Sequence, residues 1–183
     1  VVIAFLPAAA VGFLAHDYIK AVLFESPRLI ATTLIIGALV LLVVARLPLT
    51  PRHHQSDALP FRVALGVGLA QCLALIPGVS RSGATIVGAL LLGADRRTAA
   101  EFSFFLSVPT MLAAFVLDVW KNRDALDASM AGDIGIGFVT AFVVAIIVVR
   151  WFLAYITKHG FRLFGWWRLI VGGLAWAALL AGY

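Results

Sequence analysis

The sequence predicts an all-α integral membrane protein, a helical bundle that contains a re-entrant helix hairpin. Three observations predict this class. Hydrophobic residues make up 63% of the 183 residues and charged residues 13%, whereas soluble domains average about 45–50% apolar and about 25% charged. Several apolar runs approach the roughly 20 residues that a helix needs to cross a bilayer. The alternating pattern of membrane β-strands is missing from the sequence.

Five apolar stretches predict ordinary membrane helices, and the linkers between them carry the charges and the helix breakers. The predicted helices cover about 1–15, 28–46, 98–118, 133–155 and 164–182. The first run is short for a span and opens "VVIAFLPAAA" without an initiator methionine. We therefore expect the chain to begin inside a helix and more sequence to precede it.

Residues 61–95 break this pattern. Two apolar runs of about 15 and 10 residues flank a Pro77–Gly78 break, and each is too short to cross a bilayer of ordinary thickness. The stretch between them is polar. Non-helical backbone at that depth is tolerated only where protein or a water-filled cavity surrounds it. We predict a re-entrant hairpin that dips into the membrane and returns on the same side.

Basic residues set the expected orientation and indicate no nucleic-acid partner, because Lys and Arg of membrane proteins gather in cytoplasmic loops. With a re-entrant hairpin, Lys20, Arg28, Lys121 and Arg123 share one side. The opposite side holds the larger set: Arg46, Arg52, Arg62, Arg96, Arg97, Arg150, Lys158, Arg162 and Arg168. The loop 47–60 is therefore predicted to be cytoplasmic and the C-terminus to lie outside.

The polar tip reads "PGVSRSGAT" over residues 77–85 and centres on Arg81. An arginine near mid-membrane costs about 2.5–3.5 kcal/mol on insertion scales, so it needs an anion or a wet cavity. Helix-capping hydroxyls, N-terminal helix amides and glycines together suit the oxygens of a phosphate group. The tip supplies these groups from Gly78, Ser80, Ser82, Gly83 and Thr85, with Ser80 or Ser82 as the cap of the following helix. The alternative is a structural ion pair, for which Glu101 is the nearest carboxylate.

Neighbouring polar residues have simpler interpretations. The stretch "TAAE" at 98–101 has the capping-box pattern, which is a better explanation of Glu101 than catalysis. Ser103 lies on the same predicted helix and indicates a close helix contact. Gln71, inside the first helix of the hairpin, is expected to form an interhelical hydrogen bond. Cys72 is the single cysteine, so no internal disulfide forms.

These residues resemble a known family. "PGVSRSGAT", the upstream "QCLALIPG", the downstream "EFSFFLSVPTM" and the opening "LPAAAVGFLAHDYIK" are similar to the undecaprenyl-diphosphate phosphatases, the bacterial bacitracin-resistance proteins. The resemblance implies a single membrane domain over 1–183 with an inverted-repeat architecture. Residues 1–46 would be the last two helices of the first repeat, the first of them truncated, and 61–183 the second repeat.

The resemblance also implies an activity. The enzyme would remove the terminal phosphate of undecaprenyl diphosphate, a polyprenyl lipid, in the bacterial inner membrane. Arg81 would clamp the pyrophosphate, with Ser80, Ser82 and Thr85 as catalytic hydroxyl contacts. Substrate-binding candidates are Gly78, Gly83 and Glu101. A divalent cation, Mg²⁺ or Ca²⁺, is implied as well, with its ligands expected upstream of Val1 in the family's first signature.

Two alternatives remain open at the level of sequence. A cationic tip between inverted halves could also serve a transporter or flippase for a lipid phosphate or another anion. Alternatively, the chain could be a structural membrane subunit in which Arg81 joins two helices. Phosphate release from a prenyl diphosphate in detergent separates an enzyme from a carrier. Membrane lipids are expected partners in either case, and a homo-oligomer is left open.

Overall fold

The computed structural model describes residues 1–15, 26–121, 123 and 131–182, and the regular elements in these ranges are all helices. The helices are α1 (Val2–Leu14), α3 (Pro27–Val44), α4 (Phe61–Cys72), the 3₁₀ turn η2 (Leu73–Leu75), α5 (Arg81–Leu91), α6 (Arg96–Lys121), α7 (Ala131–His159) and α8 (Arg162–Leu180). The all-α prediction is confirmed. Lys20, which the orientation argument used, lies outside the described residues.

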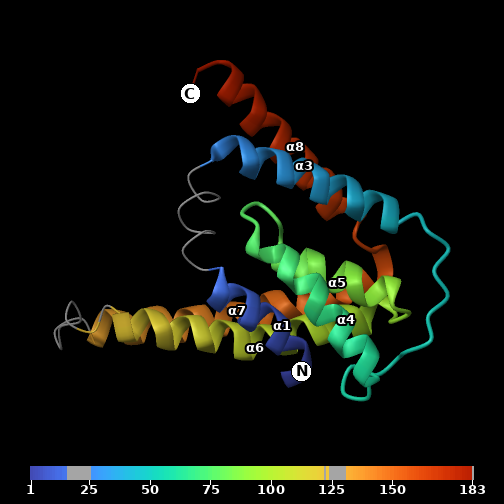
Figure 1. Cartoon of the computed structure of the whole chain (residues 1–183), viewed down its shortest axis with the longest axis horizontal. Coiled ribbons are helices and arrows are strands. Elements are labelled where there is room, and N and C mark those ends of the chain that lie inside the picture. Colours follow the sequence, from blue (N-terminus) through green and yellow to red (C-terminus); the bar gives the residue numbers. More distant parts are fainter. Residues whose placement is uncertain (16–25, 122, 124–130, 183) are drawn as a thin grey trace.

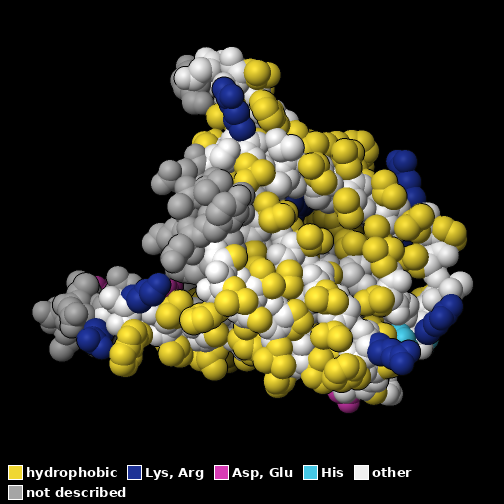
Figure 2. Space-filling view, in the orientation of Figure 1, with side chains coloured by type: hydrophobic (Ala, Val, Ile, Leu, Met, Phe, Trp, Pro, Cys, Tyr) yellow, Lys and Arg dark blue, Asp and Glu magenta, His cyan; other side chains and the backbone are white. Residues whose placement is uncertain are grey.

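Four of the described helices, α3, α6, α7 and α8, are long and apolar enough to cross a membrane. They match four of the five predicted spans, and the chain is a multi-pass membrane protein. The fifth predicted helix is formed as α1, and its 13 residues agree with the short apolar run noted in the sequence. At 1.5 Å per residue this is about 20 Å, shorter than the hydrocarbon core. Figure 2 shows hydrophobic side chains over most of one face, with Lys and Arg at its margins.

The hairpin of α4 and α5 lies between two helix pairs (Figure 1). On one side α3 packs along α8, and on the other α5 packs on α6, which runs beside α7. Helix α1 packs on α4. At 12 and 11 residues, α4 and α5 are each too short to span a bilayer. The predicted hairpin at 61–95 is therefore formed, and its depth in a bilayer stays a prediction.

Small residues let the helices approach closely. A Cβ added to Gly68 of α4 would overlap the backbone of Ala4 in α1. At the α3–α8 crossing, a Cβ on Gly172 would lie 2.8 Å from the side chain of Ile35. Glycine and alanine at crossings are the usual means by which membrane helices gain van der Waals contact. The first crossing holds α1 against α4 of the hairpin, and the second holds α8 against α3.

Helix α6 begins differently from the sequence prediction. The Asp95 carboxylate accepts a hydrogen bond from the Thr98 amide at 2.7 Å, so Asp95 is the N-cap and Thr98 is already inside the helix. The capping-box interpretation of 98–101 was wrong. The reason is that α5 ends in a turn through Gly93, whose φ is 90°, and Asp95 is the first residue after that turn with a side-chain acceptor.

Candidate functional site

The hairpin tip is a tight turn that requires glycine at its centre. Gly78 has a φ of 83°, a region that L side chains rarely adopt. A Cβ at this position would also overlap the Thr33 hydroxyl and lie 2.6 Å from the Ile30 carbonyl oxygen, both in α3. The Thr33 hydroxyl donates to the Pro77 carbonyl at 2.7 Å. The turn is thus pressed against α3 and fixed by it.

Ser80 is the N-cap of α5 and immediately precedes its first residue, Arg81. Its backbone is extended, and its hydroxyl accepts a hydrogen bond from the Gly83 amide at 3.1 Å. The Ser82 hydroxyl lies 3.2 Å from the Ser80 hydroxyl, and Ser82 is exposed. The sequence prediction that Ser80 or Ser82 caps this helix is confirmed for Ser80. Both hydroxyls lie at the positive end of the α5 dipole, where anions are favoured.

Thr85 lies one turn further along α5 and is only 1% exposed. Its hydroxyl lies within hydrogen-bond distance of the Arg81 carbonyl at 3.0 Å, and 2.6 Å from the Ser103 hydroxyl of α6. The contact predicted for Ser103 is therefore made with Thr85. These bonds hold the first turn of α5 against α6. Thr85 therefore supports the helical turn that carries Arg81.

Arg81 is half-buried and lines a cavity of about 750 Å³ between α1, the end of α4 and α6. Among the described residues no carboxylate lies within ion-pair distance of its guanidinium. Glu101, the proposed structural partner, instead accepts from Arg97 at 2.7 Å and from the Ser56 hydroxyl at 3.0 Å. The ion pair between Arg81 and Glu101 is not formed. The Ser56 bond joins Glu101 to the loop before α4, and the Arg97 bond is an i,i+4 pair within α6.

A second arginine reaches the tip from α8, and sequence reasoning missed it. Arg168 donates from Nη2 to the Gly78 carbonyl at 2.9 Å. It packs against Gly37 of α3 and lines a second cavity, of about 410 Å³, together with Ser80 and Gly83. Its Nε is buried and has no hydrogen-bond partner in the part of the chain that the structure describes.

The orientation argument had placed Arg168 in the cytoplasmic set. In the structure its side chain contacts the hairpin tip, a role that the orientation argument did not include. The side of the membrane on which Arg168 lies stays a prediction. A signal was present in the sequence: Arg168 follows Trp166 and Trp167 and precedes "LIVGG", so it lies inside an apolar span. A charged residue within a span is by default a functional candidate.

Gln71 also departs from its predicted role. It is 2% exposed, yet neither Oε1 nor Nε2 has a hydrogen-bond partner among the described residues. The predicted interhelical hydrogen bond is therefore not made. Gln71 lines the same cavity as Arg81.

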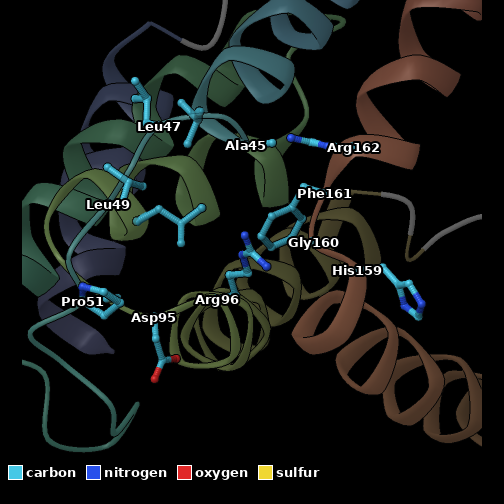
Figure 3. Close-up of a pocket in the computed structure, with 13 residues that line it drawn as sticks. Ala45, Leu47, Leu49, Pro51, Asp95, Arg96, His159, Gly160, Phe161 and Arg162 are labelled. Atoms are coloured by element: carbon cyan, nitrogen blue, oxygen red, sulfur yellow. The ribbon is translucent and has the colours of Figure 1, made fainter.

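A third cavity, of about 290 Å³, lies at the other end of the hairpin (Figure 3). It is formed by the loop after α3, the α5–α6 turn and the α7–α8 turn, with Asp95 and Arg96 on its wall. It contains none of the predicted site residues, so it is not a candidate for the predicted phosphate site.

The described residues were also compared with the ligand requirements of a divalent cation. Mg²⁺ and Ca²⁺ take several carboxylate or carbonyl oxygens. Within 1–15, 26–121, 123 and 131–182, no three His, Cys, Asp or Glu side chains come together. These residues therefore do not by themselves form a complete ligand set for a divalent cation.

Comparisons with known proteins give the context of this geometry. A family model described as bacitracin resistance protein BacA matches residues 1–174. A Cereibacter sphaeroides protein named undecaprenyl-diphosphatase is 63% identical over 183 residues, which are 100% of this chain and 68% of that protein. A Paracoccus denitrificans protein of the same name is 60% identical with the same coverage. Undecaprenyl-diphosphatase 1 of Agrobacterium fabrum is 57% identical over 180 residues, 98% of this chain and 67% of its own length.

Proposed function

The chain belongs to the bacitracin resistance protein BacA family, and from that premise we propose that it hydrolyses undecaprenyl diphosphate to undecaprenyl phosphate and phosphate. The observation that carries the proposal to particular residues is Arg81. Its half-buried guanidinium lines an otherwise mainly apolar cavity, and no carboxylate of the described chain pairs with it. Such an arginine is stabilised by an anion or by water in a cavity, and a lipid diphosphate supplies the anion at the polar end of an apolar chain.

The reaction adds water to the terminal phosphorus. A bond forms from the water oxygen to that phosphorus, and its bond to the bridging oxygen breaks. The bridging oxygen leaves with undecaprenyl phosphate, and the hydrogens of the water are distributed between the two phosphate products. Phosphoryl transfer depends mainly on positioning and on stabilising the charge of the phosphoryl oxygens.

At the hairpin tip, the chain's own groups supply both the positioning and the stabilisation of negative charge. Arg81 binds the pyrophosphate oxygens, and the first amides of α5 add their positive dipole end. The cap made by Ser80 and the Thr85–Ser103 bond hold this end of α5 in place. Mg²⁺ or Ca²⁺ remains an expectation from the family resemblance. The described residues offer no ligand set for it, so the steps here use only the chain's own groups.

The same proposal includes the cellular setting. The multi-pass chain lies in the bacterial plasma membrane, with the loop 47–60 in the cytoplasm and the C-terminus outside. The concentration of basic residues in and around that loop supports this orientation. The two short helices of the hairpin then enter the membrane from the cytoplasmic side and return to it.

The test is phosphate release from a C15 prenyl diphosphate by the purified protein in detergent. Removing the guanidinium with Arg81→Ala is expected to lower turnover by about 10²–10³-fold, by analogy with the loss of one preorganised transition-state donor. The matched control is Arg62→Ala, which removes an exposed arginine at the start of α4 and should leave turnover unchanged. Near-normal turnover by Arg81→Ala contradicts the clamp, and no release by the unmutated protein favours a carrier.

A further inference from the structure

Gln71 is a polar side chain for which the described fold gives no internal role. It lies in the last turn of α4 and is 2% exposed, with both polar atoms of its amide unpaired among the described residues. The nearby buried hydroxyls differ, since Thr85 and Ser103 bond to each other at 2.6 Å. Gln71 thus differs from these hydroxyls. Arg168 leaves only its Nε unpaired and still donates to Gly78 through Nη2, whereas both polar atoms of the Gln71 amide are unpaired among the described residues.

An unpaired buried amide is costly. Leaving a buried donor or acceptor without a partner costs about 1–3 kcal/mol, so native proteins keep few such groups. A leucine at this position would have a similar volume without that cost. The amide is therefore expected to bond to something that enters the cavity rather than to the protein itself.

The surroundings of Gln71 limit what that ligand is. The walls of its cavity are mostly apolar and come from α1, η2 and α6. Among the polar lining residues, the Thr110 hydroxyl already donates to the Leu106 carbonyl at 2.8 Å. The other polar groups of this cavity are the Gln71 amide, the Arg81 guanidinium and the Lys121 amine. They come from three different helices, α4, α5 and α6. A mainly apolar cavity with a few convergent polar groups is the usual form of a site for an amphipathic ligand.

We propose that Gln71 contacts the phosphate head group of the substrate that Arg81 binds. Nε2 donates to an oxygen of the terminal phosphate, and Oε1 accepts from the attacking water. A neutral amide can do both at once, because it carries donors and an acceptor on one planar group. Glutamine serves in this way in phosphoryl transfer, where it orients the attacking water. This inference rests on the proposed hydrolysis and names a second substrate-contacting residue for it.

The first experiment compares Gln71→Leu with Gln55→Leu, the same substitution at an exposed loop glutamine. The affinity for a non-hydrolysable C15 prenyl methylenediphosphonate and the hydrolysis of the C15 diphosphate are measured for both. Losing a hydrogen bond to a charged phosphate is expected to lower the affinity of Gln71→Leu about 10-fold or more, and its kcat/KM by about 10–100-fold. Gln55→Leu should match the unmutated protein in both measurements.

The second experiment separates substrate contact from a structural role. Because the amide is unpaired in the protein, Gln71→Leu should have a ligand-free Tm at least equal to that of the unmutated protein. Gln71→Glu places a carboxylate in the cavity with Arg81 and should weaken analogue binding further, by repulsion of the phosphate. A lower Tm for Gln71→Leu with unchanged affinity would show a structural residue and overturn the inference.

The two proposals fail in different ways. If Gln71→Leu binds the analogue and hydrolyses substrate like the unmutated protein, the inference about Gln71 is wrong and the hydrolase stands. If the unmutated protein binds the analogue but releases no phosphate from the C15 diphosphate, the hydrolase proposal is wrong. The affinity of Gln71→Leu for the analogue then still decides whether Gln71 contacts the head group.

Discussion

Arg81 and Arg168 bring positive charge to the hairpin tip from different elements. Arg81 begins α5 and lines the cavity on the side of α1 and α6, whereas Arg168 comes from α8 and lines the cavity beside α3. Their immediate environments differ as well. Arg168 already donates to the Gly78 carbonyl, so part of its hydrogen-bonding capacity holds the turn. Arg81 has no described ion-pair partner, which leaves its charge for the substrate.

The role of Arg168 can be tested with Arg168→Lys and Arg168→Met. Both remove the planar Nη2 donor to Gly78, and a hydrogen bond from a charged group contributes about 1.5–3 kcal/mol. We expect a lower Tm in detergent for both variants and slower phosphate release, because the turn before Arg81 loses a support. Met should have the larger effect since it also removes the charge.

The control for this series is Arg162→Met, at the exposed first residue of α8. It should leave both the Tm and phosphate release near those of the unmutated protein. An Arg168→Met variant with unchanged Tm and unchanged turnover would show that the bond to Gly78 is dispensable.

At the scale of elements, the junction between α5 and α6 depends on Asp95. Its amide donates to the His53 carbonyl at 3.0 Å, and its carboxylate lies 2.8 Å from Nδ1 of His54. Burial raises the pKa of Asp95, but the hydrogen bond from the Thr98 amide and the contact with His54 outweigh it. The pKa therefore lies below its ordinary value of 3.8. The loop before the hairpin is thereby fastened to the start of α6.

This shift predicts a pH dependence of stability. A carboxylate with a lowered folded-state pKa stabilises the fold above its unfolded pKa of about 3.9, and that contribution is lost as the pH falls through the folded value. The Tm of the unmutated protein should fall as the pH drops below about 4. Asp95→Asn should remove this dependence while keeping the N-cap, because Asn caps a helix about as well as Asp. Asp95→Ala should also destabilise the protein at pH 6, by about 1 kcal/mol, the usual cost of losing a helix cap.

The measurement is the Tm in detergent between pH 3 and pH 7. Asp57→Asn, in the exposed part of the same loop, is the control and should keep the pH profile of the unmutated protein. An unchanged profile for Asp95→Asn would exclude Asp95 as the group responsible.

At the scale of the whole molecule, the long helices α6 and α7 extend beyond the rest of the bundle (Figure 1). None of the residues in the apolar window of α7 is buried, and side chains such as Phe138, Phe142 and Ile147 are more than half exposed. A helix that is apolar and uncovered in a membrane protein is expected to face lipid tails. A second copy of the chain is the other candidate to cover it.

A spin label distinguishes these two environments. The label is attached at Ile147→Cys in a Cys72→Ala background, which removes the single native cysteine. In lipid vesicles we expect high accessibility to dissolved oxygen and low accessibility to a water-soluble nickel chelate. A label at Gln55→Cys in the exposed loop should show the reverse. Exclusion of both reagents at position 147 would mean that protein covers the helix and would support a homo-oligomer.

Much of this architecture followed from the sequence, because its causes are local. Span length is set by the bilayer, so apolar run lengths located α3, α6, α7 and α8. The hairpin followed from two runs that are too short to cross, separated by Pro77 and Gly78. A serine cap at Ser80 or Ser82 followed from their place at the start of a helix, and the structure assigned it to Ser80. Arg81 followed from the cost of an arginine in apolar sequence.

The errors have a different origin. The Arg168–Gly78 bond joins residues 90 positions apart, and the Thr33–Pro77 bond joins residues 44 apart. Neither spacing leaves a trace in local periodicity. The Asp95 cap was missed because the turn through Gly93 decides where α6 begins. Gln71 was assigned an internal partner because most buried amides have one.

The sequence by itself thus determined that the protein is a helical membrane protein with a cationic hairpin tip, since hydropathy and helix breaking act on neighbouring residues. Only the tertiary structure decided which groups meet at that tip. It brought Arg168 to Gly78, left Arg81 without a described carboxylate partner, and placed Gln71 unpaired in the cavity of Arg81. Those outcomes depend on how α1, α3, α6 and α8 pack around the hairpin, and packing between distant segments is set by the shapes of whole helix faces.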